Sequence, residues 1–265
     1  MLRWRARAET LAVLSLKGGT GKTTTVRTLA DVFRRIGLDV LAIDLDPQGN
    51  LSDYFDVAPD ASPTIADVLS GQAKAKAASH AGVIPASPIL AEVERSMSGK
   101  MGRELVLRKA LKDVRMEHDL VLIDCPPALG LLTINGLVAA DWALVSSEAQ
   151  YFALQGVEGA LEVVEQAKEF YNPDLEFLGV ALNIADMRTK HSRDAYEQLK
   201  EHYGQKVFET VVRASIAYAE SAEKGVSILD HRPDLGADYL ALADEVLQRV
   251  GLKDARKKLK PLRAA

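Results

Sequence analysis

Apolar residues follow two alternating patterns along this chain. Short runs rich in Val, Ile and Leu, typical of buried strands, are separated by longer segments in which apolar residues recur every three or four positions, typical of amphipathic helices. The runs that predict strands are 10–16, 40–43, 82–86, 120–123, 142–146, 178–183 and 207–212. The alternation predicts an α/β fold with a mostly parallel central sheet and helices on both faces.

Helical periodicity is clearest after the first predicted strand. A helix should begin near Thr23, because apolar residues follow at helical spacings as far as Gly37, a residue type that commonly ends helices. The segments 107–114, 157–171, 196–203 and 240–250 show the same periodicity. The segment 57–79 is rich in Pro, Ala and Ser, and we expect a surface excursion there with one short helix.

Length and composition favour a single domain. The chain has 265 residues, 48% of them hydrophobic, which is enough for one large core. We expect an N-terminal extension over 1–9, the domain over 10–250 and a basic tail over 251–265. The single cysteine excludes an intramolecular disulfide, and neither a signal peptide nor a membrane-spanning stretch is evident. The sequence therefore favours a cytoplasmic protein.

The overall charge argues against a surface that attracts nucleic acid everywhere. The formal net charge is −4 and the pI is near 5.8, so any DNA binding must come from local patches. The clearest patch is the tail, although its cations could equally form a solvated, partly disordered end. Its basic residues are Lys253, Arg256, Lys257, Lys258, Lys260 and Arg263.

A glycine-rich segment lies between the first predicted strand and the first predicted helix. A phosphate-binding loop forms in this setting, because glycines let backbone N–H groups point inward and the helix N-terminus adds positive potential. Lys22 can reach the terminal phosphates and Thr23 can supply a hydroxyl to Mg²⁺. A purely structural glycine turn would not need this whole pattern in this position. The predicted nucleotide-binding residues are Lys17, Gly18, Gly19, Thr20, Gly21, Lys22, Thr23 and Thr24.

Two predicted strands end in acidic residues. Asp44 and Asp46 follow the strand 40–43, and Asp124 follows the strand 120–123. Taken alone, each would be a common cap or turn residue. Ligands of parallel α/β sheets bind beyond the carboxyl ends of the strands, however, and phosphoryl transfer needs Mg²⁺ and an oriented water. Beside a phosphate loop, these carboxylates are therefore predicted to belong to the site.

The loop departs from the ordinary G-x-x-x-x-G-K-[ST] pattern. Leu16 stands where the first glycine would be, and Lys17 adds a second lysine that can project out of its own site. The segment 17–23 resembles the deviant Walker A motif of the ParA and MinD ATPases, in which the early lysine reaches the ATP of the opposite subunit. The segment 44–50 is similar to the first switch of ParA and Soj proteins, whereas MinD proteins lack its Pro-Gln-Gly-Asn continuation. The segments 151–157 and 207–212 also look like family segments.

The resemblance implies a single-domain P-loop NTPase that binds ATP and Mg²⁺. Asp124 looks like the Walker B carboxylate, Asp46 looks like the residue that orients the attacking water, and Asp44 is implied to organise the first switch. Pro126 and Pro127 stiffen the second switch. Asn183, which ends a strand, faces the adenine or is a structural cap. The implied catalytic residues are Lys17, Lys22 and Asp46, and the implied magnesium residues are Thr23, Asp124 and Asp46.

The resemblance also implies a cycle of partners. ATP closes a homodimer, the dimer binds DNA without sequence preference, and a ParB-like activator or a cargo adaptor stimulates hydrolysis and release, which implies association with the nucleoid. The family's Pro-Arg-Asn-Val-Arg segment is replaced here by Arg-Ala-Ser-Ile-Ala at 213–217. Arg188 matches a basic position of the family, and Lys190 and Arg213 are further candidate DNA contacts.

Three functions follow as alternatives. The first is DNA partitioning, and the second is positioning of a protein cargo or organelle over the nucleoid, which the altered arginine segment keeps open. The third is a MinD-like membrane switch. It requires a C-terminal helix with a bulky apolar face, and Leu252, Leu259 and Leu262 make a poor one, so the sequence argues against a membrane partner.

Overall fold

Seven strands form one sheet in the computed structural model, which describes residues 7–58, 60–150 and 153–264. The strand order is β3-β2-β4-β1-β5-β6-β7, and every pairing between neighbouring strands is parallel. The strands are β1 (Glu9–Leu14), β2 (Val40–Asp44), β3 (Val83–Ile84), β4 (Leu120–Asp124), β5 (Trp142–Glu148), β6 (Glu176–Ala185) and β7 (Val207–Arg213). The predicted fold class is therefore confirmed.

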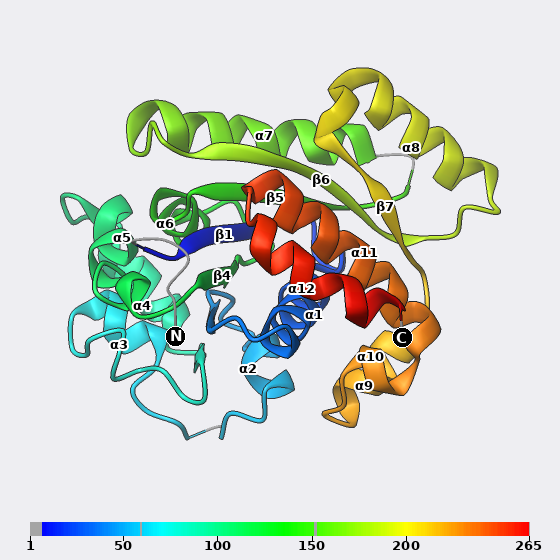
Figure 1. Ribbon diagram of the computed structural model, residues 1–265. Coiled ribbons are helices and arrows are strands. Elements are labelled where there is room, and N and C mark those ends of the chain that lie inside the picture. The colour runs from blue at the N-terminus through cyan, green and yellow to red at the C-terminus, as the bar shows by residue number, and fades with distance from the viewer. Residues whose placement is uncertain (1–6, 59, 151–152, 265) are drawn as a thin grey trace.

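Helices cover both faces of this sheet (Figure 1). Leu11 and Val13 of β1 join one hydrophobic core, whereas Ala12 and Leu14 join the core on the opposite face. Parallel sheets are buried in this way because the connections between their strands lie over both faces. The helices are α1 (Lys22–Arg35), α2 (Asn50–Tyr54), α3 (Ile65–Ser70), α4 (Leu90–Met97), α5 (Val106–Ala110), α6 (Leu131–Ala139), α7 (Ala153–Phe170), α8 (Lys190–Tyr203), α9 (Ala217–Glu223), α10 (Ile228–His231), α11 (Pro233–Val250) and α12 (Lys253–Ala264).

Two predicted strands are shorter than expected. β1 ends at Leu14 rather than at residue 16, and Ser15 already belongs to the following loop, where its hydroxyl donates to the Lys17 carbonyl at 2.6 Å. β3 is confined to Val83–Ile84 at the edge of the sheet, and the next residue, Pro85, has no N–H to continue a ladder.

The periodic segment 107–114 does not form one helix. α5 ends at Ala110, and the chain resumes as the 3-10 turn η2 (Val114–Met116). The buried Arg115 in η2 bonds to the Ala8 carbonyl and to Asp141, and these contacts draw the chain out of the helical path. Two more 3-10 turns are η1 (Arg103–Leu105) and η3 (Gly204–Lys206).

Both segments that were predicted to lie outside the domain contain regular secondary structure. Glu9, assigned to the N-terminal extension, already belongs to β1, and the segment expected as a basic tail holds α12. Residues 1–6, and the first two residues of the segment 151–157, lie outside the described residues. The excursion over 57–79 holds the short helix α3. α7 ends at Phe170, so Tyr171 lies just beyond the predicted helix.

Candidate functional site

The glycine-rich loop leaves β1 at the middle of the sheet. β1 pairs with β4 on one side and β5 on the other, so connections diverge here, and ligands of such sheets bind at this point. Gly19 and Gly21 both have φ near 81°, a left-handed conformation that glycine adopts without strain. A Cβ at Gly18 would lie 3.8 Å from Pro127 Cβ, and one at Gly21 would lie 3.3 Å from the Asn183 side chain. The loop therefore packs between two residues predicted to belong to the site.

Lys22 begins α1 and its amine turns back into the loop. Its Nζ donates to Ser15 Oγ at 2.9 Å and lies 3.5 Å from the Lys17 carbonyl oxygen. Lys22 is only 6% exposed. Burial lowers the pKa of the Lys22 amine, and the charge of Asp124 opposes this shift. The loop thus holds a buried cation at the N-terminus of a helix, the arrangement that binds phosphate.

Thr23 and Asp124 bring α1 and β4 together. Thr23 Oγ1 donates to Asp124 Oδ2 at 2.7 Å, whereas Asp124 Oδ1 is buried with no hydrogen-bond partner among the described residues. Burial raises the pKa of Asp124 well above its usual value, and nearby Asp44 adds to the shift. A buried carboxylate oxygen without a donor fits a cation or a cation-bound water.

The donor set suits Mg²⁺ rather than an ion held entirely by protein. In the described ranges, no three His, Cys, Asp or Glu side chains are grouped as metal ligands. Mg²⁺ commonly takes one or two carboxylates, with water and substrate phosphates completing its octahedron. Thr23, Asp124 and Asp46 could supply the Mg²⁺ ligands that come from the protein. Their role in binding magnesium stays a prediction.

Asp44 and Asp46 end β2 and have different surroundings. Asp44 is fully buried and accepts hydrogen bonds from the Ser52 amide at 3.0 Å, the Ser52 hydroxyl at 2.8 Å and the Asp46 amide at 3.1 Å. Burial raises the pKa of Asp44 to about 6. Asp46 accepts from the Gln48 amide at 3.0 Å and lines the pocket. Asp44 therefore fixes the turn that carries Asp46 to the pocket.

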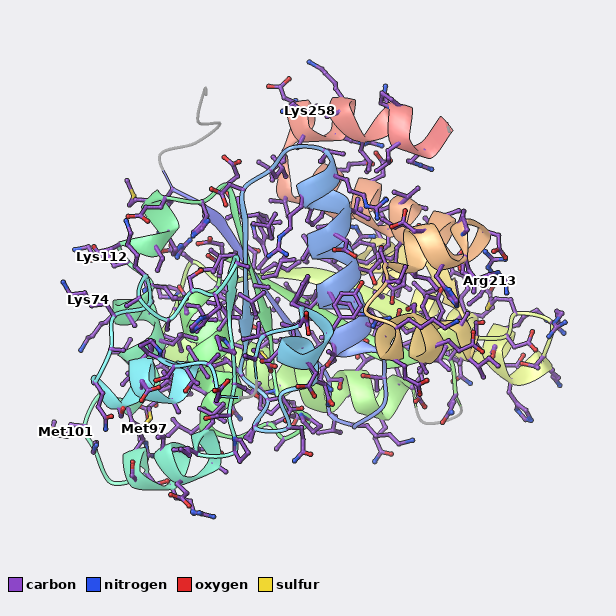
Figure 2. All side chains as sticks on the ribbon, turned by 90° about the horizontal axis from the view of Figure 1, so that it is seen from below. Lys74, Met97, Met101, Lys112, Arg213 and Lys258 are labelled. Atoms are coloured by element: carbon purple, nitrogen blue, oxygen red, sulfur yellow. The ribbon has the colours of Figure 1, made fainter. Side chains whose placement is uncertain are left out.

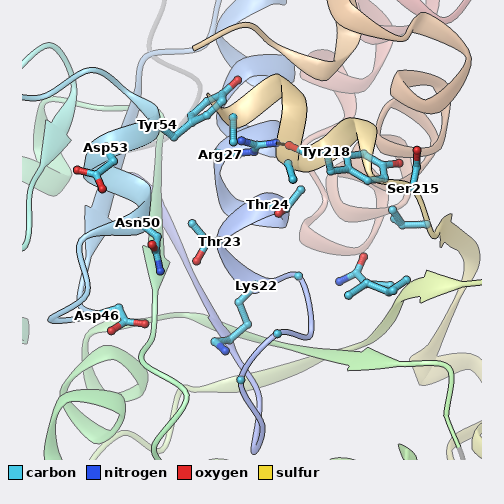
Figure 3. A pocket seen from close by; sticks show the side chains of 18 of the residues that line it. Lys22, Thr23, Thr24, Arg27, Asp46, Asn50, Asp53, Tyr54, Ser215 and Tyr218 are labelled. Carbon is cyan, nitrogen blue, oxygen red and sulfur yellow. Dashed lines mark hydrogen bonds between the residues drawn. The ribbon is translucent and has the colours of Figure 1, made fainter. Parts of the chain in front are cut away.

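The loop glycines, Lys22, Thr23 and Asp46 line a pocket of about 870 Å³. Figure 3 shows Asp46, Thr23 and Lys22 in one part of it, and Arg27, Tyr54 and Tyr218 in another part, beyond Thr24. The volume is within the range of sites for small molecules. One end of the pocket thus combines loop glycines and Lys22, which suit the phosphates of a nucleoside triphosphate, with Asp46, which suits a bound cation or water.

Arg27 is a pocket residue that the sequence analysis missed. It is 3% exposed, its guanidinium lies 4.1 Å from the centroid of the Tyr54 ring, and its Nη2 donates to the Tyr218 carbonyl at 2.8 Å and to Ser221 Oγ at 2.9 Å. These contacts join α1, α2 and α9. The sequence does contain one signal that could have identified Arg27, because it is a charged residue within the apolar stripe of the first helix.

Asn183 supports the loop from β6. Its Nδ2 donates to Ser146 Oγ at 2.7 Å and also lies 3.2 Å from both the Thr20 carbonyl oxygen and Thr25 Oγ1. Asn183 Oδ1 is buried, with no partner in the described part of the chain, and the residue lines the pocket. The side chain thus braces the loop and leaves an acceptor free, so its contact with adenine stays a prediction.

Lys17 behaves differently from Lys22. Its side chain is 71% exposed, and its Nζ lies 3.8 Å from Glu148 Oε2. Lys17 lines a smaller cavity on another side of the loop, with Ser15 and Glu148, and is absent from the described residues that line the large pocket. The amine is therefore available to a group outside its own nucleotide site.

The candidate DNA contacts are distributed over separate elements. Arg188 makes two contacts of 2.8 Å with the Asp186 carboxylate and holds the pKa of that carboxyl at about 2. Arg213 pairs with Asp238 at 2.9 Å. Lys190 begins α8 and is exposed. Each arginine is already paired with a carboxylate and is therefore less available to bind DNA phosphates.

Pro126 and Pro127 directly follow β4 and the buried Cys125. Pro127 lines the pocket, against the loop at Gly18. Burial raises the pKa of the Cys125 thiol, so this cysteine packs as a small apolar residue and not as a nucleophile.

Comparisons with known proteins agree with this geometry. A family model described as an AAA domain matches residues 8–177. The chain is 38% identical over 251 residues to the chromosome-partitioning ATPase Soj of Thermus thermophilus, covering 93% of this chain and 98% of that protein. A cobyrinic acid a,c-diamide synthase from Mycobacterium smegmatis, with bound ATP analogue and magnesium, is similar at a TM-score of 0.74 and 36% identity, covering 82% and 93% of the two chains. Apo McdA from Cyanothece gives a TM-score of 0.83 at 27% identity, covering 91% and 99%.

Proposed function

Because the chain belongs to the AAA-domain family and is a P-loop ATPase of the ParA and Soj type, we propose that it is a DNA-partitioning ATPase whose dimerisation is switched by ATP. The observation that carries this proposal is the contrast between its two loop lysines. Lys22 is buried inside the pocket, whereas Lys17 is exposed outside it.

The chemistry is Mg²⁺-dependent hydrolysis of ATP. In our proposal, backbone N–H groups of the loop and Lys22 hold the phosphates. Thr23 and Asp124 hold Mg²⁺, directly or through water, and Asp46 orients the attacking water. Mg²⁺ neutralises charge that develops on the γ-phosphate. The buried Asp124 oxygen and the lined pocket support this assignment.

The position of Lys17 supports the proposed dimerisation. An exposed amine beside the phosphate loop can meet the triphosphate of a second copy placed face to face, and the charge of ATP then stabilises the dimer. The ion pair that Lys17 gives up, with Glu148 at 3.8 Å, is long and partly exposed, so it contributes little on its own.

We propose that the dimer binds DNA without sequence preference and that a ParB-like activator stimulates its hydrolysis, which would place the protein in the cytoplasm, associated with the nucleoid. Pairing two copies doubles the number of phosphate contacts, so a weak patch on each copy can give strong binding. Positioning of a protein cargo over the nucleoid would use the same ATP and DNA steps with a different adaptor.

A membrane switch is a weaker alternative. None of the helices in the described ranges combines the length and the apolar character that a membrane span requires. Leu259 of α12 is fully buried, and Leu252 and Leu262 pack against the core. An amphipathic membrane anchor needs such side chains free.

The proposal is tested by measuring oligomeric state and DNA binding in parallel. Size-exclusion chromatography should give a dimer with Mg²⁺ and ATP and a monomer with ADP. Fluorescence anisotropy with random-sequence duplex DNA should show binding only in the ATP state. A protein that hydrolyses ATP as a monomer, with DNA affinity independent of nucleotide, would refute this function.

A further inference from the structure

The C-terminal segment carries an unusual share of the positive charge. Residues 251–265 contain six basic residues and one acidic residue, Asp254, a formal charge of +5. Since the whole chain carries −4, residues 1–250 carry −9. A polyanion approaching this protein is therefore repelled by most of the chain and attracted by this segment.

α12 is attached to the domain by one of its sides. Ala255 is 3% exposed, Leu259 is 0% exposed, and Leu262 packs against the same core. Figure 2 shows α12 at the margin of the molecule, where the label of Lys258 marks it. The apolar side chains of this helix are thus occupied by packing within the chain.

Asp244 of α11 fixes the orientation of α12. It accepts hydrogen bonds from Arg256 at 2.8 and 2.9 Å, and Arg263 Nη1 lies 2.9 Å from its Oδ2. Two of the six cations are therefore used to dock the helix. The rest of its positive charge is carried by lysines.

Three of these lysines form a stripe along the solvent side. Lys253, Lys257 and Lys260 are exposed and are separated by four and three residues, so they share one face of the helix. Ala255, Leu259 and Leu262 have the same spacing and lie about half a turn away, on the packed side. The α12 lysine stripe, defined as Lys253, Lys257 and Lys260, therefore lies on the side of the helix opposite the packed residues and extends over about 10 Å. At its start, Lys253 also lines a small cavity with His118 and Asp119.

The stripe is only weakly neutralised by acids of the described chain. Lys257 pairs with Asp254 at 2.9 Å, between side chains that are 74% and 52% exposed. A pair this exposed is weak and is screened by salt. By contrast, Arg188 and Arg213 each make two hydrogen bonds from the guanidinium to a neighbouring carboxylate. The stripe is thus the more available cation group.

We propose that the α12 lysine stripe is the surface on which this protein docks the phosphate backbone of duplex DNA. The inference rests on the proposed function and adds the residues that serve it. Over about 10 Å, duplex DNA presents roughly three phosphates on each strand, which matches three lysines in a row. Lysines act as mobile point charges on phosphates, and they carry no geometric code for bases, as binding without sequence preference requires.

The same charges would attract an anionic membrane surface, but the apolar residues needed for insertion are missing from the solvent side of α12 as described. Surface attraction alone gives about 1 kcal/mol per lysine near an anionic leaflet. DNA is a denser polyanion and releases counterions on binding. The observations therefore favour DNA.

The test compares two triple variants in the full-length protein. The stripe variant combines Lys253→Gln, Lys257→Gln and Lys260→Gln. The control combines Lys74→Gln, Lys109→Gln and Lys112→Gln, three exposed lysines of the same charge in another region, two of which are labelled in Figure 2. Both should retain ATP-dependent dimerisation and basal ATP turnover, because none of the six lysines lines the large pocket that contains the phosphate loop.

With ATP and random-sequence duplex DNA, the stripe variant should bind at least tenfold more weakly. Its plot of log K against log salt should be flatter by about 0.9 for each phosphate that the protein no longer neutralises. The control should bind like the unmodified protein. Unchanged affinity in the stripe variant, or an equally weakened control, would overturn the inference while leaving the proposed function standing.

Two further outcomes are distinguishable from these. An unmodified protein that binds no DNA in any nucleotide state would overturn the proposed function itself. Pelleting with anionic phospholipid vesicles that depends on the stripe, without an effect on DNA, would assign the stripe to membranes and reject our proposal.

Discussion

The hydroxyl of Thr23 and the carboxylate of Asp124 are joined by a hydrogen bond of 2.7 Å, although 101 residues separate them in the chain. The two residues come from adjacent parts of the fold, the start of α1 and the end of β4. Asp124 is 1% exposed, so its charge is costly without a partner. A cation such as Mg²⁺ would neutralise that charge at the Asp124 oxygen that has no donor among the described residues.

Asp124→Asn should stabilise the nucleotide-free protein and weaken its response to ligand. Removing a buried charge relieves a desolvation cost, so we expect a gain of about 1–2 kcal/mol in the free energy of unfolding. The additional stabilisation that Mg²⁺ and ATP give the unmodified protein should be largely lost. Thermal unfolding with and without Mg²⁺-ATP measures both effects. Thr23→Ser, which keeps the hydroxyl, should respond to ligand normally, and an Asp124→Asn protein that does so too would remove our assignment of Asp124.

Asp46→Ala should separate binding from hydrolysis. Asp46 lines the pocket from the turn that Asp44 fixes, and its carboxylate accepts a hydrogen bond from the Gln48 amide in that turn. We expect ATP binding and dimerisation to persist while turnover falls about a hundredfold or more. Steady-state phosphate release and size-exclusion chromatography measure the two. Asp53→Ala is the matched control, because Asp53 lines the same pocket from α2, and hydrolysis in Asp46→Ala equal to that in the control would contradict the assigned role.

Lys17→Ala should abolish ATP-dependent dimerisation and leave folding intact. The side chain is 71% exposed and its ion pair with Glu148 is long. We expect the free energy of unfolding to change by less than about 0.5 kcal/mol. Sedimentation with ATP should show a monomer, whereas Lys100→Ala, at another exposed lysine, should dimerise. A dimeric Lys17→Ala protein would show that this lysine does not act on a second copy.

Most strands of this fold could be predicted from the sequence, because strands buried on both faces form continuous apolar runs. α6 could not be. Its residues from Leu132 to Ala139 are nearly all buried, so it has no polar face and no periodicity to detect. α9 and α10 are short and carry weak patterns for a different reason, since few turns give few repeats.

The phosphate loop and the strand-end aspartates could be predicted because the residues that would act chemically lie within short motifs next to predicted strands. The end of the pocket around Arg27 could not be predicted from the sequence. The contacts of Arg27 with Tyr218 and Ser221 join residues 191 and 194 positions apart, and no local pattern encodes them. Likewise, Arg213 is paired with Asp238 of α11, so the availability of Arg213 to DNA depends on tertiary structure.

Arg27→Ala should destabilise the fold more than an exposed substitution would. The guanidinium stacks on Tyr54 and bonds to α9, so its loss leaves a cavity and removes one donor from both the Tyr218 carbonyl and the Ser221 hydroxyl. We expect the free energy of unfolding to fall by about 1–3 kcal/mol in urea titrations. Tyr54→Phe keeps the ring and removes the bond from its hydroxyl to Asp31, so it should cost less than Arg27→Ala. The reverse order would show that the hydrogen bond from Tyr54 to Asp31 contributes more to stability than the contacts of Arg27 do.

Asp244→Asn should loosen α12 in a pH-dependent way. Hydrogen bonds from Arg256 and the charges of Arg256 and Arg263 lower the pKa of Asp244 below its usual 3.8. A carboxyl with a lowered pKa in the folded state contributes stability that is present above pH 3.8 and is lost as the pH falls through the lower, folded value. Because Arg256 and Arg263 are partly exposed, this contribution should be about 1 kcal/mol.

The unmodified protein should therefore exceed Asp244→Asn in free energy of unfolding by about that amount at neutral pH, and the difference should shrink below pH 3.8. Urea titrations at a series of pH values measure it. Asp254→Asn, which removes the exposed partner of Lys257, should cost less at every pH. If the difference in free energy of unfolding stayed the same in acid, the effect of Asp244→Asn would come from the changed side-chain shape and not from the lost charge. In that case Arg256 and Arg263 would not hold α12 by ion pairing.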